Sequence, residues 1–102
     1  MYNVHKLAEI LAFQTGAVVS RTIIDKPAGT VTLFALDAGQ GLSEHSAPFD
    51  ALVQILEGAL SVRVGGHVHE LAAGEMIVMP ADVPHALSAA VPAKFLLTMI
   101  KA

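Results

Sequence analysis

Short segments in which apolar and polar residues alternate, separated by turn-forming residues, fill the sequence from residue 17 to residue 100. The segments are rich in β-branched and aromatic residues, which favour strands, and the breaks between them contain glycine and proline. The alternation is clearest in "ALSVRV" (59–64), and the "GG" that follows at 65–66 predicts a tight hairpin turn. About eight or nine short strands at this spacing are typical of a β-sandwich or barrel. The sequence therefore predicts an all-β domain.

Two of the predicted strands, "FDALVQIL" (49–56) and "KFLLTMI" (94–100), carry apolar residues on both faces. A strand of this kind is covered on both sides. One cover is the interior of the barrel, and the other is a second sheet or a second subunit, of which we favour the subunit. Hydrophobic residues make up 54% of the chain, which is more than one small core can bury. The sequence thus predicts a homodimer.

The first residues differ in character from the predicted strands. Asn3 is suited to cap a short helix, and the apolar residues that follow fall on one helical face. A length of 102 residues suits one domain. We expect a single domain over residues 1–102, with a helix and a strand over about 1–28 and the barrel core over about 29–102.

Charge and composition exclude several classes of function. The formal net charge is -3 and the six basic residues are scattered, so the chain lacks the basic face that nucleic acid requires. Cysteine is absent, which excludes disulfides and a thiol nucleophile. No apolar run reaches the ~20 residues of a membrane span. The N-terminus lacks the apolar core of a secretion signal, so we expect a cytoplasmic protein.

The turns between the predicted strands carry motifs that resemble those of a known family. "LEG" at 56–58, "AGE" at 73–75 and "MPADVPH" at 79–85 resemble the motifs of small single-domain type-2 cupins, over residues of about 29 to 100. This resemblance implies a double-stranded β-helix, the jelly-roll barrel that RmlC-like cupins share, with a short N-terminal helix before it.

The first motif of the family is kept only in part. Counted from Gly39, the family's first histidine falls on His45. The second histidine position holds Ala47, and the glutamate position, counted back from Gly58, holds Ala51.

The second motif is kept more fully. Gly74 and Pro80 match the family pattern, Asp82 replaces its glycine, and His85 matches its histidine. The asparagine position holds Ala89. The barrel signals are therefore present, while the metal-binding motif is degenerate, with two of the family's four ligands.

The resemblance implies that His45 and His85 converge inside the barrel from different strands. We expect them to anchor a small organic molecule in an apolar pocket, because an apolar cavity with a few convergent polar groups is the usual form of a binding site. Ala47, Ala51 and Val53 are the residues expected to line this pocket with the two histidines.

A metal-dependent cupin enzyme, of the dioxygenase or isomerase type, is the alternative. His45 and His85 would then be ligands of a divalent transition metal: Zn, Fe, Mn, Ni or Cu. Two histidines rarely suffice, since catalytic zinc sites use three protein ligands and non-heme iron adds a carboxylate. Asp50 is the weak third candidate, because strand alternation places it on the face opposite Ala51 unless a bulge turns it inward.

Two further interpretations remain open. The histidines could act as acid and base without metal, as in sugar-epimerising cupins, although no arginine or lysine is obviously close enough to clamp a substrate. His45 could also be a polar residue at a strand end that forms an ordinary hydrogen bond. The pair His67 and His69 follows a hairpin turn, so we expect both to face solvent rather than a metal.

Overall fold

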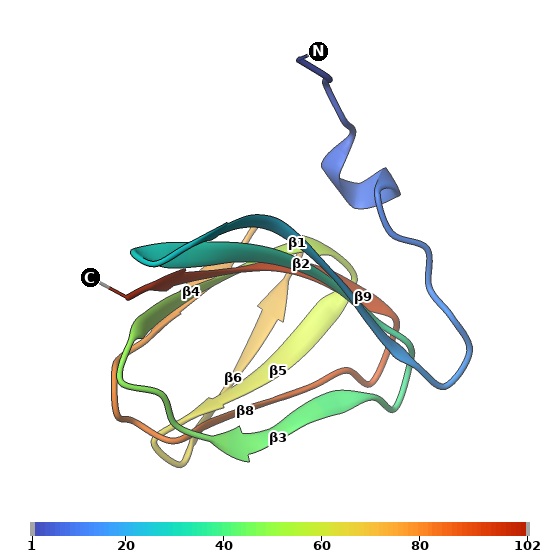
Figure 1. The fold of residues 1–102 in the computed structure, drawn as a ribbon. Coiled ribbons are helices and arrows are strands. Elements are labelled where there is room, and N and C mark those ends of the chain that lie inside the picture. The colour runs from blue at the N-terminus through green and yellow to red at the C-terminus, as the bar shows by residue number, and fades with distance from the viewer. Residues whose placement is uncertain (1, 102) are drawn as a thin grey trace.

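The computed structural model describes residues 2–101, and nine strands account for most of them. They form two antiparallel sheets that face each other (Figure 1). The five-stranded sheet has the order β1-β2-β9-β4-β7 and the four-stranded sheet the order β3-β8-β5-β6. The strands are β1 (Val18–Lys26), β2 (Gly29–Leu36), β3 (Gly41–His45), β4 (Asp50–Glu57), β5 (Ala59–Val64), β6 (His67–Ala72), β7 (Met76–Met79), β8 (His85–Ser88) and β9 (Ala93–Ile100). This is the predicted jelly-roll barrel.

The core lies between the two sheets and follows the predicted alternation. Ala51, Val53 and Ile55 of β4 face inward and are buried, whereas Leu52 on the other face is only half-buried. The other buried residues of the hydrophobic core come from seven other segments: Leu36, Leu60, Val62, Leu71, Met79, Leu87, Ala89, Ala93 and Phe95. Close packing of this kind leaves few voids larger than a water molecule. The interior of the barrel is therefore largely filled by side chains.

The N-terminal helix is shorter than the sequence suggested. It is a single turn of 3-10 helix, η1 (Leu7–Glu9), that begins after Lys6 and has no side-chain cap, so Asn3 does not cap it. A helix this short gains too little from its own hydrogen bonds to persist without packing. No helix among residues 2–101 is long and apolar enough to cross a lipid bilayer.

Lys94 forms a hydrogen bond that attaches this N-terminal segment to the outer face of the five-stranded sheet. Only 7% of Lys94 is exposed, and its Nζ donates a hydrogen bond to the carbonyl of Ala8 at 2.5 Å. The same ammonium lies 4.8 Å from the centre of the Phe13 ring and 3.8 Å from Oε1 of Glu57. An ammonium can be buried when it has partners of this kind. The segment thereby covers part of one sheet face.

Two turns depend on glycine. Gly65 and Gly66 both have positive φ, at 56° and 84°, and join β5 to β6 in the tight hairpin that the sequence predicted. Gly58 links β4 to β5, where the chain passes from one sheet to the other. Its φ is 75°, and a Cβ there would lie 2.1 Å from the carbonyl oxygen of Pro92. The "LEG" motif therefore marks a crossing that no larger residue can occupy.

Candidate functional site

The pairing of β3 with β8 brings His45 and His85 together. The two residues lie directly opposite each other in this antiparallel pair, although 40 positions separate them in the chain. His85 opens β8 and is buried, with 5% of its surface exposed, whereas His45 ends β3 and is exposed. The convergence that the motif spacing implied is thus present in the structure.

A bulge in β3 turns His45 toward its partner. Leu42 pairs with Leu87 and His45 with His85, so three steps on β3 match two steps on β8. Without the extra residue, His45 would lie on the face opposite Leu42, because side chains alternate along a strand. With it, His45 lies on the face of Leu42, which packs against the core.

The two imidazoles meet through their Nε2 atoms. These atoms are 3.0 Å apart, and the rings are edge-to-face at 74° with centroids 4.3 Å apart. Nδ1 of His45 donates to the carbonyl of Ser43 at 2.8 Å, and Nδ1 of His85 donates to that of Val83 at 3.2 Å. A carbonyl oxygen can only accept, so each Nδ1 carries a hydrogen, and a ring that is neutral then presents a lone pair at Nε2.

Electrostatics favour a neutral His85. Burial lowers the pKa of His85 below its ordinary value, the nearby His45 lowers it further, and the hydrogen bond to Val83 opposes them in part. Were His45 neutral as well, two Nε2 lone pairs would point at each other across 3.0 Å. That contact is favourable only when a proton, a cation or a hydrogen-bond donor lies at it.

Two loops frame the pair and are tied to each other. The amide of Asp82 donates to the carbonyl of Ala47 at 2.8 Å, and the amide of Ala81 donates to Oδ1 of Asp50 at 2.9 Å. Asp82 has a φ of 64°, so it adopts the left-handed conformation that explains the glycine at this position of the family motif. Asp50 therefore holds the loop that leads into His85.

The structure places the other predicted site residues on β4, on the loop before it and on β6. Ala51 and Val53 lie in the packed core, on the inward face of β4. Residues 2–101 contain no group of three or more His, Cys, Asp or Glu side chains that could hold a metal ion, so Asp50 is not placed as a third ligand. His67 and His69 are both exposed on β6, as expected.

The backbone carbonyls of Ser43 and Val83 were not foreseen as site groups. They fix which nitrogen of each ring is free, yet any residue type supplies a carbonyl, so the sequence carries no signal for them.

The pair itself suits two adjacent positions around a metal ion. With metal–nitrogen bonds of about 2.0–2.1 Å, nitrogens 3.0 Å apart subtend an angle of about 90°. Neutral imidazoles are good ligands for the first-row transition metals. The remaining positions would have to come from solvent or from a bound molecule.

Comparison with solved structures finds close matches. A conserved protein of unknown function from Streptococcus pyogenes is 34% identical, with a TM-score of 0.95, and the match covers 100% of this chain and 90% of that one. A cupin 2 conserved barrel domain protein from Leptotrichia buccalis is 36% identical, with a TM-score of 0.90, over 93% of this chain and 46% of that one.

An RmlC-like cupin from Shewanella frigidimarina shares the fold, with a TM-score of 0.81, at 20% identity over 85% of this chain and 78% of that one. Among proteins of curated function, none matches the chain. The model of the cupin domain matches residues 32–99, which include both histidines and all strands of the barrel except β1, the start of β2 and the last residue of β9. The chain is therefore a member of the cupin domain family.

Proposed function

We propose that this protein binds a small organic molecule that carries hydroxyl or amino hydrogens, anchored on the two Nε2 atoms of His45 and His85. The observation that carries the proposal is their 3.0 Å separation while both Nδ1 atoms are engaged by carbonyls. Two acceptors aimed at one point suit a ligand with hydrogen-bond donors, such as a polyol or a catechol.

The exposure of the two rings sets the direction from which the ligand approaches. Because His85 is buried and the core is filled, the ligand reaches the pair from the side of exposed His45. Ala47, in the loop that follows, stands where the family has a histidine, and its methyl group leaves room there. Ala51 and Val53 support the site from the core rather than from an open chamber.

A metal-dependent site is the second candidate, supported by the angle of about 90° that two metal–nitrogen bonds would make. His45 and His85 would hold the ion and the organic molecule would complete its coordination. A divalent transition metal would supply Lewis-acid polarisation of a bound oxygen. The neutral state of His85 serves this function as well, since a protonated imidazole cannot be a ligand.

Thermal unfolding of untagged protein tests the binding proposal. Catechol, glycerol, glucose and ethanolamine are added singly, and we expect at least one to raise Tm in the wild type, because a ligand of the native state stabilises it by mass action. We expect the rise to vanish in His45→Ala and in His85→Ala. His69→Ala, which removes an exposed imidazole from β6, is the matched control and should keep the rise.

Metal analysis separates the two candidates. If the protein contains stoichiometric metal that both His45→Ala and His85→Ala lose, the metal-dependent site is correct. If a ligand raises Tm equally in the wild type and in both variants, the histidine pair is not the anchor and the proposal fails.

A further inference from the structure

The outer face of the four-stranded sheet carries a hollow of about 410 Å³, on the opposite side of the sheet from the histidine pair. Small side chains produce it. Gly41 of β3, Ser88 of β8 and Ser61 of β5 follow one another across the sheet in a single row. On the exposed face of a sheet such a row leaves the backbone uncovered, because none of its members projects far from the strands.

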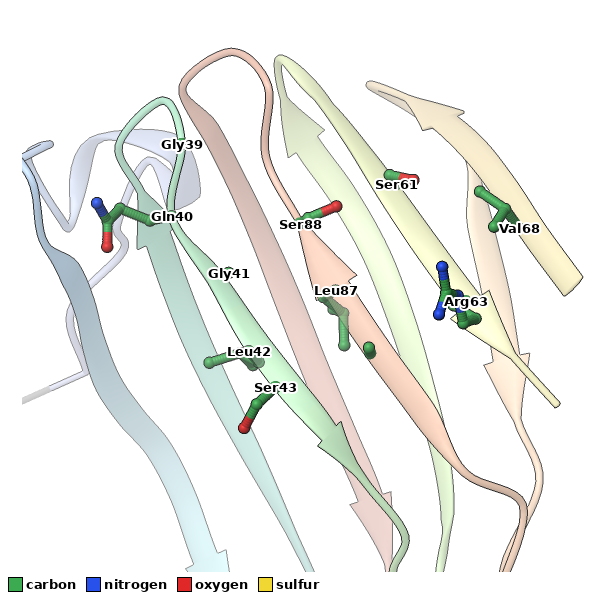
Figure 2. A pocket seen from close by; sticks show the side chains of 11 residues that line it. Gly39, Gln40, Gly41, Leu42, Ser43, Ser61, Arg63, Val68, Leu87 and Ser88 are labelled. Atoms are coloured by element: carbon green, nitrogen blue, oxygen red, sulfur yellow. The ribbon is translucent and has the colours of Figure 1, made fainter. Parts of the chain in front are cut away.

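Longer side chains stand around this floor (Figure 2). Arg63 on β5 and Val68 on β6 are paired neighbours at one side, and Gln40 lies at the other, beside the turn that precedes β3. A volume of about 410 Å³ falls within the ~300–1,000 Å³ that is usual for small-molecule sites. The hollow is thus large enough for a small organic molecule.

Arg63 is the one charged side chain among the residues that line the hollow. The ion pairs within residues 2–101 join Lys6 to Glu9 and Lys94 to Glu57, and neither involves this guanidinium. Arginine presents donors in a planar fork that matches carboxylate and phosphate oxygens. Its charge therefore selects a ligand of opposite sign.

The hydroxyls of the hollow complement this charge. Ser43 and Ser88 line it from β3 and β8, and a hydroxyl can donate to an anionic oxygen. Ser61 donates instead to Oε1 of Glu70 at 2.8 Å, which leaves the Ser61 oxygen as an acceptor. Glu70 lies on β6 opposite Ser61, at the edge of the sheet. Its carboxylate accepts this bond and disfavours anions beside β6, so the anion is expected on the side of Arg63 that faces β8 and Ser88.

We propose that this outer groove binds the oxyanion group, carboxylate or phosphate, of a small organic molecule, with Arg63 as the charged partner and Ser43 and Ser88 as hydroxyl donors. The apolar part of the ligand lies against Val68 and Ala86. This site is independent of the ligand site proposed at His45 and His85, since it lies on the other face of the sheet.

Titration of ¹⁵N-labelled protein, followed by amide chemical shifts, tests the proposal. The probes are sodium succinate and phenyl phosphate, each at an ionic strength held constant with sodium chloride. We expect saturable shifts in residues 40–43, 61–63 and 86–88 with at least one probe. The probe that binds more tightly identifies carboxylate or phosphate as the preferred group.

Two variants examine the role of the guanidinium. Arg63→Gln should weaken the binding about tenfold or more, since it removes a charge-assisted hydrogen bond. Ala86→Glu places a carboxylate on β8 opposite Arg63 and should have the same effect while the arginine is kept. Arg21→Gln, which removes an equal charge from exposed β1, is the control and should bind as the wild type does.

The shift pattern separates this site from the proposed function. Shifts confined to residues near His45 and His85, shifts that do not saturate with either probe, or equal affinity in Arg63→Gln would each overturn the groove proposal. The first result would indicate binding at the histidine pair instead, and the other two leave the Tm response of the wild type and its loss in His45→Ala unaffected. The dispersion of the amide spectrum verifies that every variant is folded.

Discussion

The imidazole of His85 sits in an environment unlike that of the same group in the unfolded chain. Its burial and the proximity of His45 lower its pKa below the ordinary value of 6.5. Below pH 6.5 the unfolded chain therefore binds a proton at this position more readily than the folded chain does. The stability that neutral His85 contributes to the fold is fully present above pH 6.5. It is lost as the pH falls from 6.5 toward the lowered pKa that His85 has in the folded protein.

The first prediction concerns this loss. We expect the free energy of unfolding to fall between pH 7 and pH 5, with a contribution from His85 of at most about 1.4 kcal/mol per pH unit. Urea unfolding of the wild type and of His85→Gln at several pH values measures it, and the pH dependence should be shallower in the variant. His69→Gln should retain the wild-type dependence. An unchanged slope in His85→Gln would show that His85 is not the responsible group.

Motif spacing predicted which residues form the pair, but not how they are oriented. Counting from Gly39 and from Pro80 led to His45 and His85, and the β3–β8 pairing places them together. The orientation depends on carbonyl positions and on the left-handed conformation of Asp82, which are properties of the backbone. A single sequence gives the identity of each side chain but not the conformation of the backbone, so the orientation of the two rings could not be predicted from it.

At the level of elements, most strands could be predicted because their alternation is strong, and the exceptions have a physical cause. β3, "GLSEH", has one apolar residue among five, so its own pattern is weak, and only the family resemblance indicated that His45 lies on a strand. Its bulge also breaks the period of two on which strand prediction depends. The N-terminal segment has a helical pattern but makes only one short turn, to which Lys94 of the sheet donates a hydrogen bond.

The second prediction concerns the crossing between β4 and β5. Gly58→Ala should destabilise the protein by about 3 kcal/mol or more, because it adds a clash with a backbone oxygen to the cost of positive φ. Gly66→Ala is the matched control, since Gly66 also has positive φ but has no atom within 4 Å of the added Cβ. We expect that variant to lose only about 1 kcal/mol.

Urea unfolding of the two variants measures how much stability each of them loses. If both lose the same amount, the close approach to Pro92 contributes nothing, and positive φ alone explains the glycine in "LEG".

For the whole molecule, the two sheets expose surfaces of different character. The outer face of the four-stranded sheet carries small and polar residues, which is where the oxyanion groove is proposed. The outer face of the five-stranded sheet carries more large apolar side chains, among them Leu52, Leu96 and Ile100. The N-terminal segment covers one part of it through Lys94, and a hollow of about 200 Å³ remains on another part, lined by Leu52, Val78, Thr98 and Ile100 together with the first residues of β4.

The last prediction is that a second copy of the chain covers this remaining apolar face. Val78 and Ile100 are 50% and 55% exposed, and the two-sided apolar character of β4 and β9 requires a cover that one chain does not supply. Light scattering should give twice the mass of one chain, and Val78→Lys with Ile100→Lys should halve it. Val68→Lys, at a side chain 53% exposed on the other sheet, should leave the dimer intact. A wild-type protein of single-chain mass at high concentration would refute the dimer, because exposed apolar area favours association most when the chains are abundant.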